Sequence, residues 1–173
     1  RALSREAFKI LYENLPCLVD DPENRGKRQQ LLLGSYLGAA ALFNSGSGIA
    51  GAISYPLGVH FKIPHGICGA VFLASVVEYN VDNGYTDYAE LLDLVKQYPD
   101  KSRRQKSLRF IELLKNLMHK LDVPLTLEKW GVTTENVEEV STLTYTLQGA
   151  FNQNPVPFDA KEKALDLLRR HVK

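Results

Sequence analysis

Residues 46–70 read GSGIAGAISYPLGVHFKIPHGICGA, and this stretch carries the most distinctive features of the sequence. Glycines come first, and they let two helices approach each other closely. Two prolines, Pro56 and Pro64, enclose a segment that we predict to be a loop, because proline interrupts a regular helix. A buried helix is then expected to begin near His65. The stretch therefore predicts a closely packed helical region with a histidine at the mouth of a helix.

Two of the four histidines, His60 and His65, lie in this stretch. A neutral imidazole is a common metal ligand and an acid–base group near neutral pH, although a histidine in a loop also occurs simply solvated or bonded within a core. Cys68 shares a helical face with His65, but zinc usually takes four ligands and no other Cys or His is near in sequence, so we interpret Cys68 as a small core residue. His119 and His171 come late in amphipathic helices and are predicted to be surface residues.

Outside this stretch, apolar residues recur at the three-to-four spacing of helices nearly throughout, and no segment alternates as a strand does. The class predicted is all-α, a bundle of about seven or eight helices. In the first half of the chain we expect a helix that ends at Pro16, a second helix over about 25–43 and a third from His65 to 82–84. In the second half we expect a helix around 88–95 that ends before Pro99, and another with an apolar stripe at 108–121 that ends before Pro124. Thr133 or Thr134 is expected to cap the next helix, and Asp159 the last one.

Composition excludes several classes of protein. The chain has 173 residues, 45% of them hydrophobic and 24% charged, which is ordinary for one soluble globular domain. It has 21 basic against 20 acidic side chains, so the basic excess of a nucleic-acid binder is missing, and we interpret the basic cluster at 101–106 as a solvated helix start. Residues 34–59 carry no charge, but their many small residues favour a buried soluble segment over a membrane span.

The two cysteines do not form a disulfide framework, which predicts a reduced, cytoplasmic setting. The first residues, RALS, contain neither an apolar signal core nor an initiator methionine, so we expect a fragment or a processed chain.

Residues 55–66, YPLGVHFKIPHG, closely resemble the signature of the iron-containing (group III) alcohol dehydrogenases. In that family a glycine-rich helix leads to His/Tyr-Pro-Leu-Gly, a short loop, Pro-His-Gly and a buried helix that ends in Asn, the position of Asn80. The segments LP at 15–16, YLGAA at 36–40 and FNSG at 43–46 resemble the helices before the signature, and NQNP at 152–155 resembles the family's closing Asn-Pro segment. The resemblance covers almost the whole chain.

The resemblance implies that residues 1–173 are the C-terminal helical domain, of the dehydroquinate synthase-like type, without the N-terminal nucleotide-binding α/β domain. The full-length protein would be an NAD(P)-dependent oxidoreductase that interconverts a small alcohol and an aldehyde or ketone, with Fe²⁺ or Zn²⁺ held by one Asp and three His, and a homodimer. The isolated chain would be inactive. The residues that match do not identify the substrate or decide between NAD and NADP.

Position by position, the resemblance makes His65 the last metal ligand and Tyr55 a cleft residue near the nicotinamide, with His60 in the variable loop beside the cleft. Two departures stand out. Gly51 occupies the position of a ligand histidine, and no Asp in the chain has a His four residues later, as the family's upstream ligand helix does. In a metal-free version of the reaction, Tyr55 or His60 would donate the proton to the carbonyl oxygen.

Two alternatives stay open. The chain could be a non-catalytic helical module, or a metal-free relative of the family, and Gly51 favours this reading. It could also belong to the wider dehydroquinate synthase and glycerol dehydrogenase group, against which the Pro-Leu-Gly and Pro-His-Gly block argues. The glycines Gly46 and Gly48 lack the third glycine of a dinucleotide-binding turn, and we interpret them as a helix-packing element.

Overall fold

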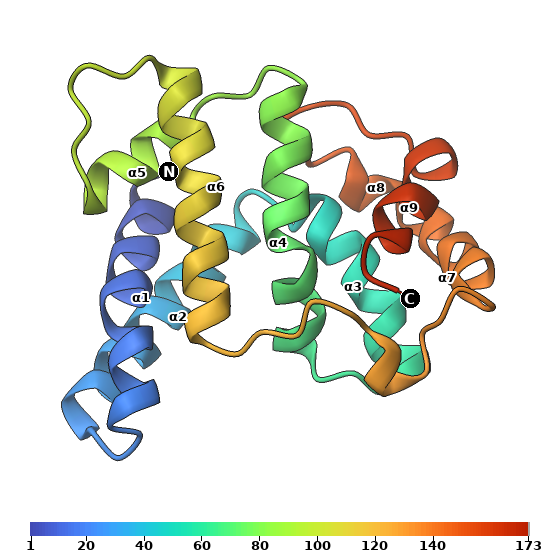
Figure 1. The fold of residues 1–173 in the computed structure, drawn as a ribbon, viewed down its shortest axis with the longest axis horizontal. Helices are drawn as coiled ribbons and strands as arrows, with labels where there is room; N and C mark the ends of the chain where they lie inside the picture. Colours follow the sequence, from blue (N-terminus) through green and yellow to red (C-terminus); the bar gives the residue numbers. More distant parts are fainter. Residues whose placement is uncertain (173) are drawn as a thin grey trace. The chain divides into compact units, whose positions relative to one another are not determined.

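A computed structural model describes residues 1–172 as helices joined by turns, with no strand among them (Figure 1). Eight α-helices of eight residues or more, and the single turn α8 (Gln148–Phe151), make up the described chain. The prediction of an all-α bundle with seven or eight helices is therefore confirmed. The chain divides into two compact units: unit 1 is Arg1–Ser45 with Gly84–Asp122, and unit 2 is Gly46–Asn83 with the chain from Val123 onward.

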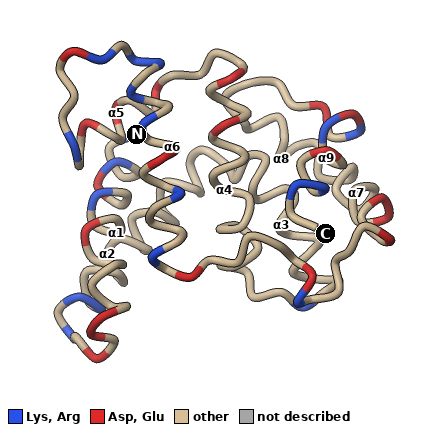
Figure 2. Tube along the Cα trace, in the orientation of Figure 1, with Lys and Arg blue, Asp and Glu red and all other residues tan. Residues whose placement is uncertain are grey.

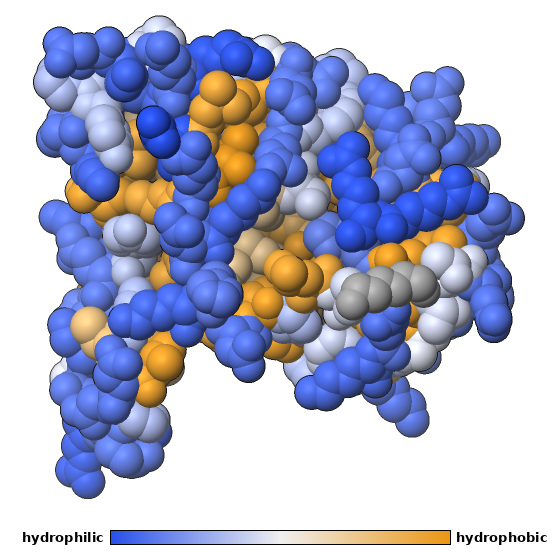
Figure 3. All heavy atoms as spheres, viewed as in Figure 1, coloured by the Kyte–Doolittle hydropathy of each residue, from blue (hydrophilic) through white to orange (hydrophobic). Residues whose placement is uncertain are grey.

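Unit 1 contains α1 (Ala2–Asp20), α2 (Arg25–Phe43), α5 (Tyr88–Val95) and α6 (Arg103–Lys120). The bounds of α2 agree with the sequence prediction. Its N-cap is Asn24, whose side-chain oxygen accepts a hydrogen bond of 3.1 Å from the backbone N–H of Lys27. Ser102 and Gln105 form a capping box that starts α6, a feature the sequence analysis missed. On the face shown in Figure 3, the surface of α6 is mainly hydrophilic.

Aromatic rings form the centre of unit 1. The ring of Phe110 in α6 lies 5.4 Å from that of Phe8 in α1 and 5.6 Å from that of Tyr88 in α5. Edge and offset contacts of this kind add to the stabilisation from burial. The rings therefore connect three of the four helices of unit 1.

Unit 2 contains α3 (Gly48–Phe61), α4 (His65–Asp82), α7 (Val137–Thr144), α8 and α9 (Ala160–Arg169), with short 3-10 turns at Glu128–Trp130 and Tyr145–Leu147. Its core is one contiguous apolar cluster, in which Ile53, Leu57, Phe72 and Leu168 have no exposed surface. Burial of this extent supplies most of the stabilisation of a folded domain.

Two predictions that depend on proline are wrong: the end of the first helix at Pro16 and the start of a loop at Pro56. Pro16 lies inside α1, which continues to Asp20, and Pro56 lies inside α3, which continues to Phe61. A proline removes one intrahelical hydrogen bond. In α3 the side chains of Pro56 and the next residue are buried in the core, and we attribute the survival of the helix to that packing. The loop predicted for residues 56–64 is only 62–64.

The cap predictions had mixed success. Asp159 caps α9 as predicted, because its carboxylate accepts from the backbone N–H groups of Lys161 at 2.9 Å and Glu162 at 3.4 Å. Neither Thr133 nor Thr134 caps α7, whose N-cap is Asn136 without a side-chain cap bond. Asn136 instead accepts from the Thr133 N–H and closes the turn before the helix.

The sequence analysis interpreted Gly46 and Gly48 as a helix-packing element, and the structure does not confirm this. They have φ values of 96° and 59°, a left-handed backbone that favours glycine; Gly46 lies in the turn before α3, and Gly48 is the first residue of the helix.

Charged residues are unevenly distributed along the chain. Acidic and basic residues are mixed along α1, and α6 is mainly basic with Glu112 as its one acidic residue, whereas α3 carries no Lys, Arg, Asp or Glu (Figure 2). None of the helices over residues 1–172 combines the length and the hydropathy that a membrane span requires.

Candidate functional site at the junction of α3 and α4

The α3–α4 junction, residues 55–66, contains the three residues that the sequence analysis selected. Ile53 and Leu57 fix the orientation of α3 by burying one face of it completely. On the opposite side, Tyr55 and Val59, one helical turn apart, are 62% and 60% exposed. The phenol of Tyr55 is therefore presented to solvent by a helix that is itself held by the core.

A tight turn positions His65. Lys62 has a left-handed backbone with φ 54° and ψ 31°, and it ends α3. Ile63 is then buried, and the carbonyl oxygen of Pro64 accepts hydrogen bonds from the N–H groups of Ile67 at 2.9 Å and Cys68 at 3.1 Å. These contacts make His65 the first residue of α4.

The start of α4 is open. Proline at the N-cap has no side-chain acceptor, and no side chain caps the helix. The first backbone N–H groups, with the positive end of the helix dipole, thus remain beside the exposed imidazole of His65. A β-carbon added at Gly66 would meet no atom within 4 Å, so the surface next to the imidazole is clear. The local chemistry favours an electron-rich oxygen or another anionic group.

The junction brings the predicted residues into one short segment without bonding them to one another. Tyr55 and His60 lie on α3 five residues apart, which places their side chains about 140° apart around the helix axis. His65 belongs to α4, and within residues 1–172 no hydrogen bond joins any two of the three. His60 and His65 are both exposed.

The side chain of Ser47 leaves no room for a side chain at Gly51. A β-carbon at this position would overlap the Cβ and Oγ atoms of Ser47, one turn earlier. A histidine there would require the first turn of α3 to move. In residues 1–172 no group of three or more His, Cys, Asp or Glu side chains is arranged to hold a metal ion. A lone imidazole at His65 does not fit a complete metal site, so we assign no catalytic step to a metal.

A pair of asparagines connects two segments that the sequence analysis treated separately. Asn80, near the end of α4, and Asn154, in the NQNP segment, exchange side-chain hydrogen bonds of 2.6 and 3.3 Å. Asn154 also donates to the carbonyl oxygen of Val156 at 2.9 Å, and the side chain of Gln153 accepts from the N–H of Ser47 at 3.1 Å. The closing segment therefore braces both the start of α3 and the end of α4.

His171 is buried, which contradicts its predicted surface position. Its Nδ1 lies 3.0 Å from the carbonyl oxygen of Leu125, and its Nε2 lies 3.0 Å from the hydroxyl of Ser75. Since a carbonyl only accepts, Nδ1 carries the proton and Nε2 accepts from Ser75. Desolvation by burial lowers the pKa of His171 below its ordinary 6.5. The prediction failed because α9 ends at Arg169 and the chain turns inward after it.

Cys68 is a core residue, as predicted. Its side chain is fully buried, and burial raises the pKa of its thiol. A thiol in this state is a poor nucleophile and a poor metal ligand.

Comparison with known proteins extends these observations. The family profile described as Fe-containing alcohol dehydrogenase family, C-terminal, matches residues 1–172. The NAD-dependent methanol dehydrogenase of Bacillus methanolicus is 26% identical over 138 residues, which are 79% of this chain and 36% of that protein. The chain thus spans little more than a third of this relative.

Solved structures also match almost the whole of this chain, and the chain covers less than half of each of them. A 1,3-propanediol oxidoreductase, at 22% identity, shares the fold with a TM-score of 0.89 over 99% of this chain and 44% of its own. The iron-containing alcohol dehydrogenase of Thermococcus thioreducens is 29% identical, with a TM-score of 0.76 over 97% of this chain and 43% of its own. The chain belongs to the Fe-containing alcohol dehydrogenase family, and it corresponds to the C-terminal domain of that family.

Proposed function

We propose that the chain is the helical half of an NAD(P)-dependent alcohol dehydrogenase that interconverts a small alcohol and an aldehyde or ketone. The observation that carries the proposal is the α3–α4 junction: an exposed imidazole, His65, at an uncapped helix start in a chain of this family. The name of the Bacillus relative supports a nicotinamide cofactor. The full-length protein is proposed to be a cytoplasmic homodimer.

The roles proposed for the junction follow from its geometry. When a carbonyl compound is reduced, its oxygen gains a proton, and the exposed side chains of Tyr55 and His60 are the candidate donors. Tyr55 is also proposed to line the nicotinamide side of the cleft. His65 is the one described residue that we propose as a ligand of Fe²⁺ or Zn²⁺, and it would hold the ion only together with ligands from outside residues 1–172.

The exposed face of α2 supports a second domain. Leu32, Tyr36 and Phe43 are 72%, 71% and 92% exposed, although apolar side chains of this size are stabilised by burial. We propose that a nucleotide-binding domain covers part of this face in the full-length protein. The isolated chain is then expected to be inactive, because residues 1–172 fold into helices and contain no strand to carry a dinucleotide-binding turn.

Gly51 favours a second candidate, a helical module that has lost the metal chemistry. The close contact with Ser47 makes this glycine part of the packing of α3, so restoring a histidine would require more than one substitution. Such a module would keep the fold and act in assembly or binding.

Metal content and turnover of the full-length protein decide between the two candidates. Near-stoichiometric iron or zinc by mass spectrometry, in protein purified without added metal, would support the dehydrogenase. Protein without metal would support the module, provided that NAD(P)-dependent oxidation of short-chain alcohols is also absent. The variant Gly51→His should be made together with Ser47→Gly, since Ser47 occupies the space that the new side chain needs.

Replacement of the proposed proton donors tests their role directly. The double variant Tyr55→Phe, His60→Gln should lose about 10²-fold or more in kcat if either side chain transfers the proton. His119→Gln, at an exposed histidine of α6 outside the junction, is the matched control and should keep full turnover. Unchanged kcat in the double variant would remove both residues from the mechanism.

A further inference from the structure

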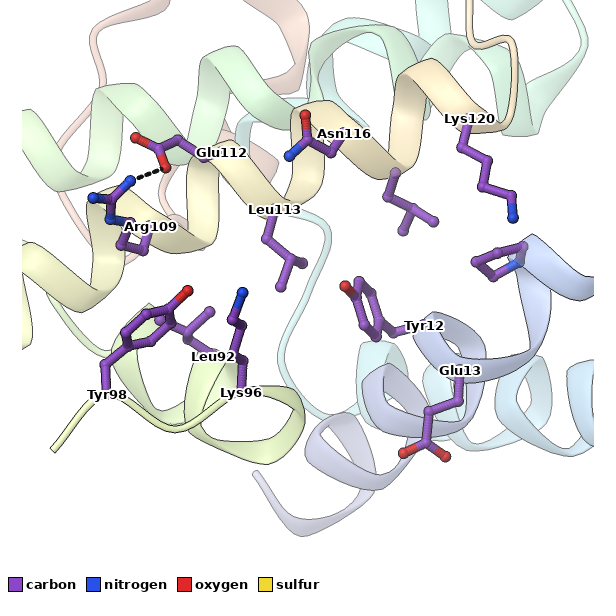
Figure 4. A pocket seen from close by; sticks show the side chains of 12 residues that line it. Tyr12, Glu13, Leu92, Lys96, Tyr98, Arg109, Glu112, Leu113, Asn116 and Lys120 are labelled. Atoms are coloured by element: carbon purple, nitrogen blue, oxygen red, sulfur yellow. Dashed lines mark hydrogen bonds and ion pairs between the residues drawn. The ribbon is translucent and has the colours of Figure 1, made fainter.

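Unit 1 contains a cleft that the proposed function does not use. It lies among α1, α5 and α6, and its volume is about 600 Å³ (Figure 4). Clefts of about 300–1,000 Å³ are typical of small-molecule sites. None of its lining residues belongs to the α3–α4 junction, so the cleft is independent of the dehydrogenase proposal.

The floor of the cleft is apolar. Leu113 and Leu117, one turn apart on α6, are half-buried, and Leu92 of α5 is almost fully buried beneath them. Pro16, the proline retained inside α1, adds to the same surface. An apolar group of a few carbon atoms would remove this surface from water at little conformational cost, because the helices already fix its shape.

Three polar groups line the cleft beside this floor. In Figure 4 the amino group of Lys96 points toward Leu113, with the hydroxyl groups of Tyr98 and Tyr12 on its two sides. The Lys96 amino group lies 5.5 Å from the centre of the Tyr98 ring, which holds it at the rim. An ammonium group between two hydroxyl donors is a suitable binding site for a carboxylate.

The charges around the cleft leave Lys96 as the available cation. Arg109 is paired with Glu112 at 2.6 Å, and Lys120 lies 3.4 Å from Asp20. No carboxylate in residues 1–172 pairs with Lys96. In Figure 4 the carboxylate of Glu13 points away from Lys96.

We propose that this cleft binds a small amphipathic monocarboxylate. Its carboxylate accepts hydrogen bonds from Lys96, Tyr98 and Tyr12, and its aromatic or aliphatic tail lies on Leu113 and Leu117. A neutral molecule of the same shape would contact the apolar floor of the cleft but would leave the Lys96 ammonium group without a charged partner. The charge of the ligand therefore decides its affinity.

Calorimetric titration of the 173-residue chain with 3-phenylpropanoate tests the proposal, with 3-phenylpropanamide as the uncharged probe of equal length. The carboxylate should bind about tenfold more tightly than the amide, the effect of one charge-assisted contact at a partly exposed site. Lys96→Met keeps most of the aliphatic stem and should weaken carboxylate binding about tenfold, to the level of the amide. Lys9→Met removes an exposed lysine of α1 that does not line the cleft, and should change nothing.

Three results would overturn the proposal: no binding of the carboxylate by the wild type, equal affinity for carboxylate and amide, or unchanged affinity in Lys96→Met. Lys96 is exposed, so its replacement should leave the thermal unfolding midpoint near that of the wild type, and the comparison of affinities then stands. Tyr98→Phe removes a single hydroxyl donor and should weaken binding by a smaller factor.

Discussion

Unit 1 and unit 2 both bury apolar side chains between helices, but in the described residues ion pairs between helices are more frequent in unit 1. Unit 2 is built on one contiguous apolar cluster that includes α3, a helix without a charged residue. In unit 1, α2 buries only Gly34, and ion pairs connect its other helices. Arg103 at the start of α6, for example, contacts Asp87 at 2.6 Å and Glu90 at 3.2 Å.

The difference has a physical consequence. Sodium chloride has little effect on the burial of apolar surface, whereas it weakens exposed ion pairs, because the Debye length falls from about 10 Å at 0.1 M salt to about 3 Å at 1 M. We therefore expect both units to respond to changes of side-chain volume in their cores, and unit 1 to be the more sensitive of the two to ionic strength. The candidate proton donors Tyr55 and His60 and the candidate ligand His65 all belong to unit 2, whose core is the apolar cluster.

We expect the largest change in the free energy of unfolding when a buried side chain is removed from the core of unit 2. Phe72→Ala removes a ring with no exposed surface that lies edge-on to His171 at 4.8 Å, and should lower the free energy of unfolding by about 3–5 kcal/mol. Tyr36→Ala, at an exposed aromatic of unit 1, should change it by no more than about 0.5 kcal/mol. Urea unfolding measures both. A loss below about 1 kcal/mol in Phe72→Ala would contradict the account of the core.

The sequence predicted most of the architecture because the pattern of apolar residues is local. The bounds of α2 and the start of α4 followed from spacing and breakers alone. The path of α3 through Pro56 did not, since it depends on a core formed by segments about a hundred residues away in sequence.

The candidate site was predictable only in part. Its residues came from a motif, but the direction of each side chain depends on which face of α3 is buried. The contact between Gly51 and Ser47 and the hydrogen bonds between Asn80 and Asn154 depend on the three-dimensional arrangement of the backbone, which no sequence pattern indicates. A buried histidine after the last helix leaves no periodic signal at all.

The free energy of unfolding should depend on pH through one buried polar group of unit 2, His171. The pKa of His171 is lowered in the folded state, so below 6.5 the unfolded chain binds its proton first. The stabilisation is complete above 6.5 and is lost as the pH falls through the folded pKa, with a limiting slope of about 1.4 kcal/mol per pH unit. His171→Gln should flatten this fall between pH 7 and 5. His119→Gln, at an exposed histidine of unit 1, should retain it.

The contact at Gly51 permits a finer test within unit 2. Gly51→Ala should cost about 0.5–2 kcal/mol, because the overlap with Ser47 outweighs the usual gain from alanine in a helix. Gly69→Ala in α4, where an added β-carbon meets nothing within 4 Å, should gain up to about 1 kcal/mol. Adding Ser47→Gly to Gly51→Ala should recover most of the loss. If Gly51→Ala alone is as stable as the wild type, the contact does not explain the glycine.

The smallest effect is expected in unit 1, at the ion pair between Asp93 of α5 and Lys106 of α6. The two lie 2.8 Å apart, and the lysine side chain is only 16% exposed. Asp93→Asn should cost about 0.2–1 kcal/mol at low salt, and the difference should shrink in 1 M NaCl. Glu23→Gln disrupts the more exposed pair with Arg28 and should cost less. A loss in Asp93→Asn that is independent of salt would mean that the hydrogen bond, rather than the charge, connects α5 to α6, and the contrast between the two units would then rest on burial alone.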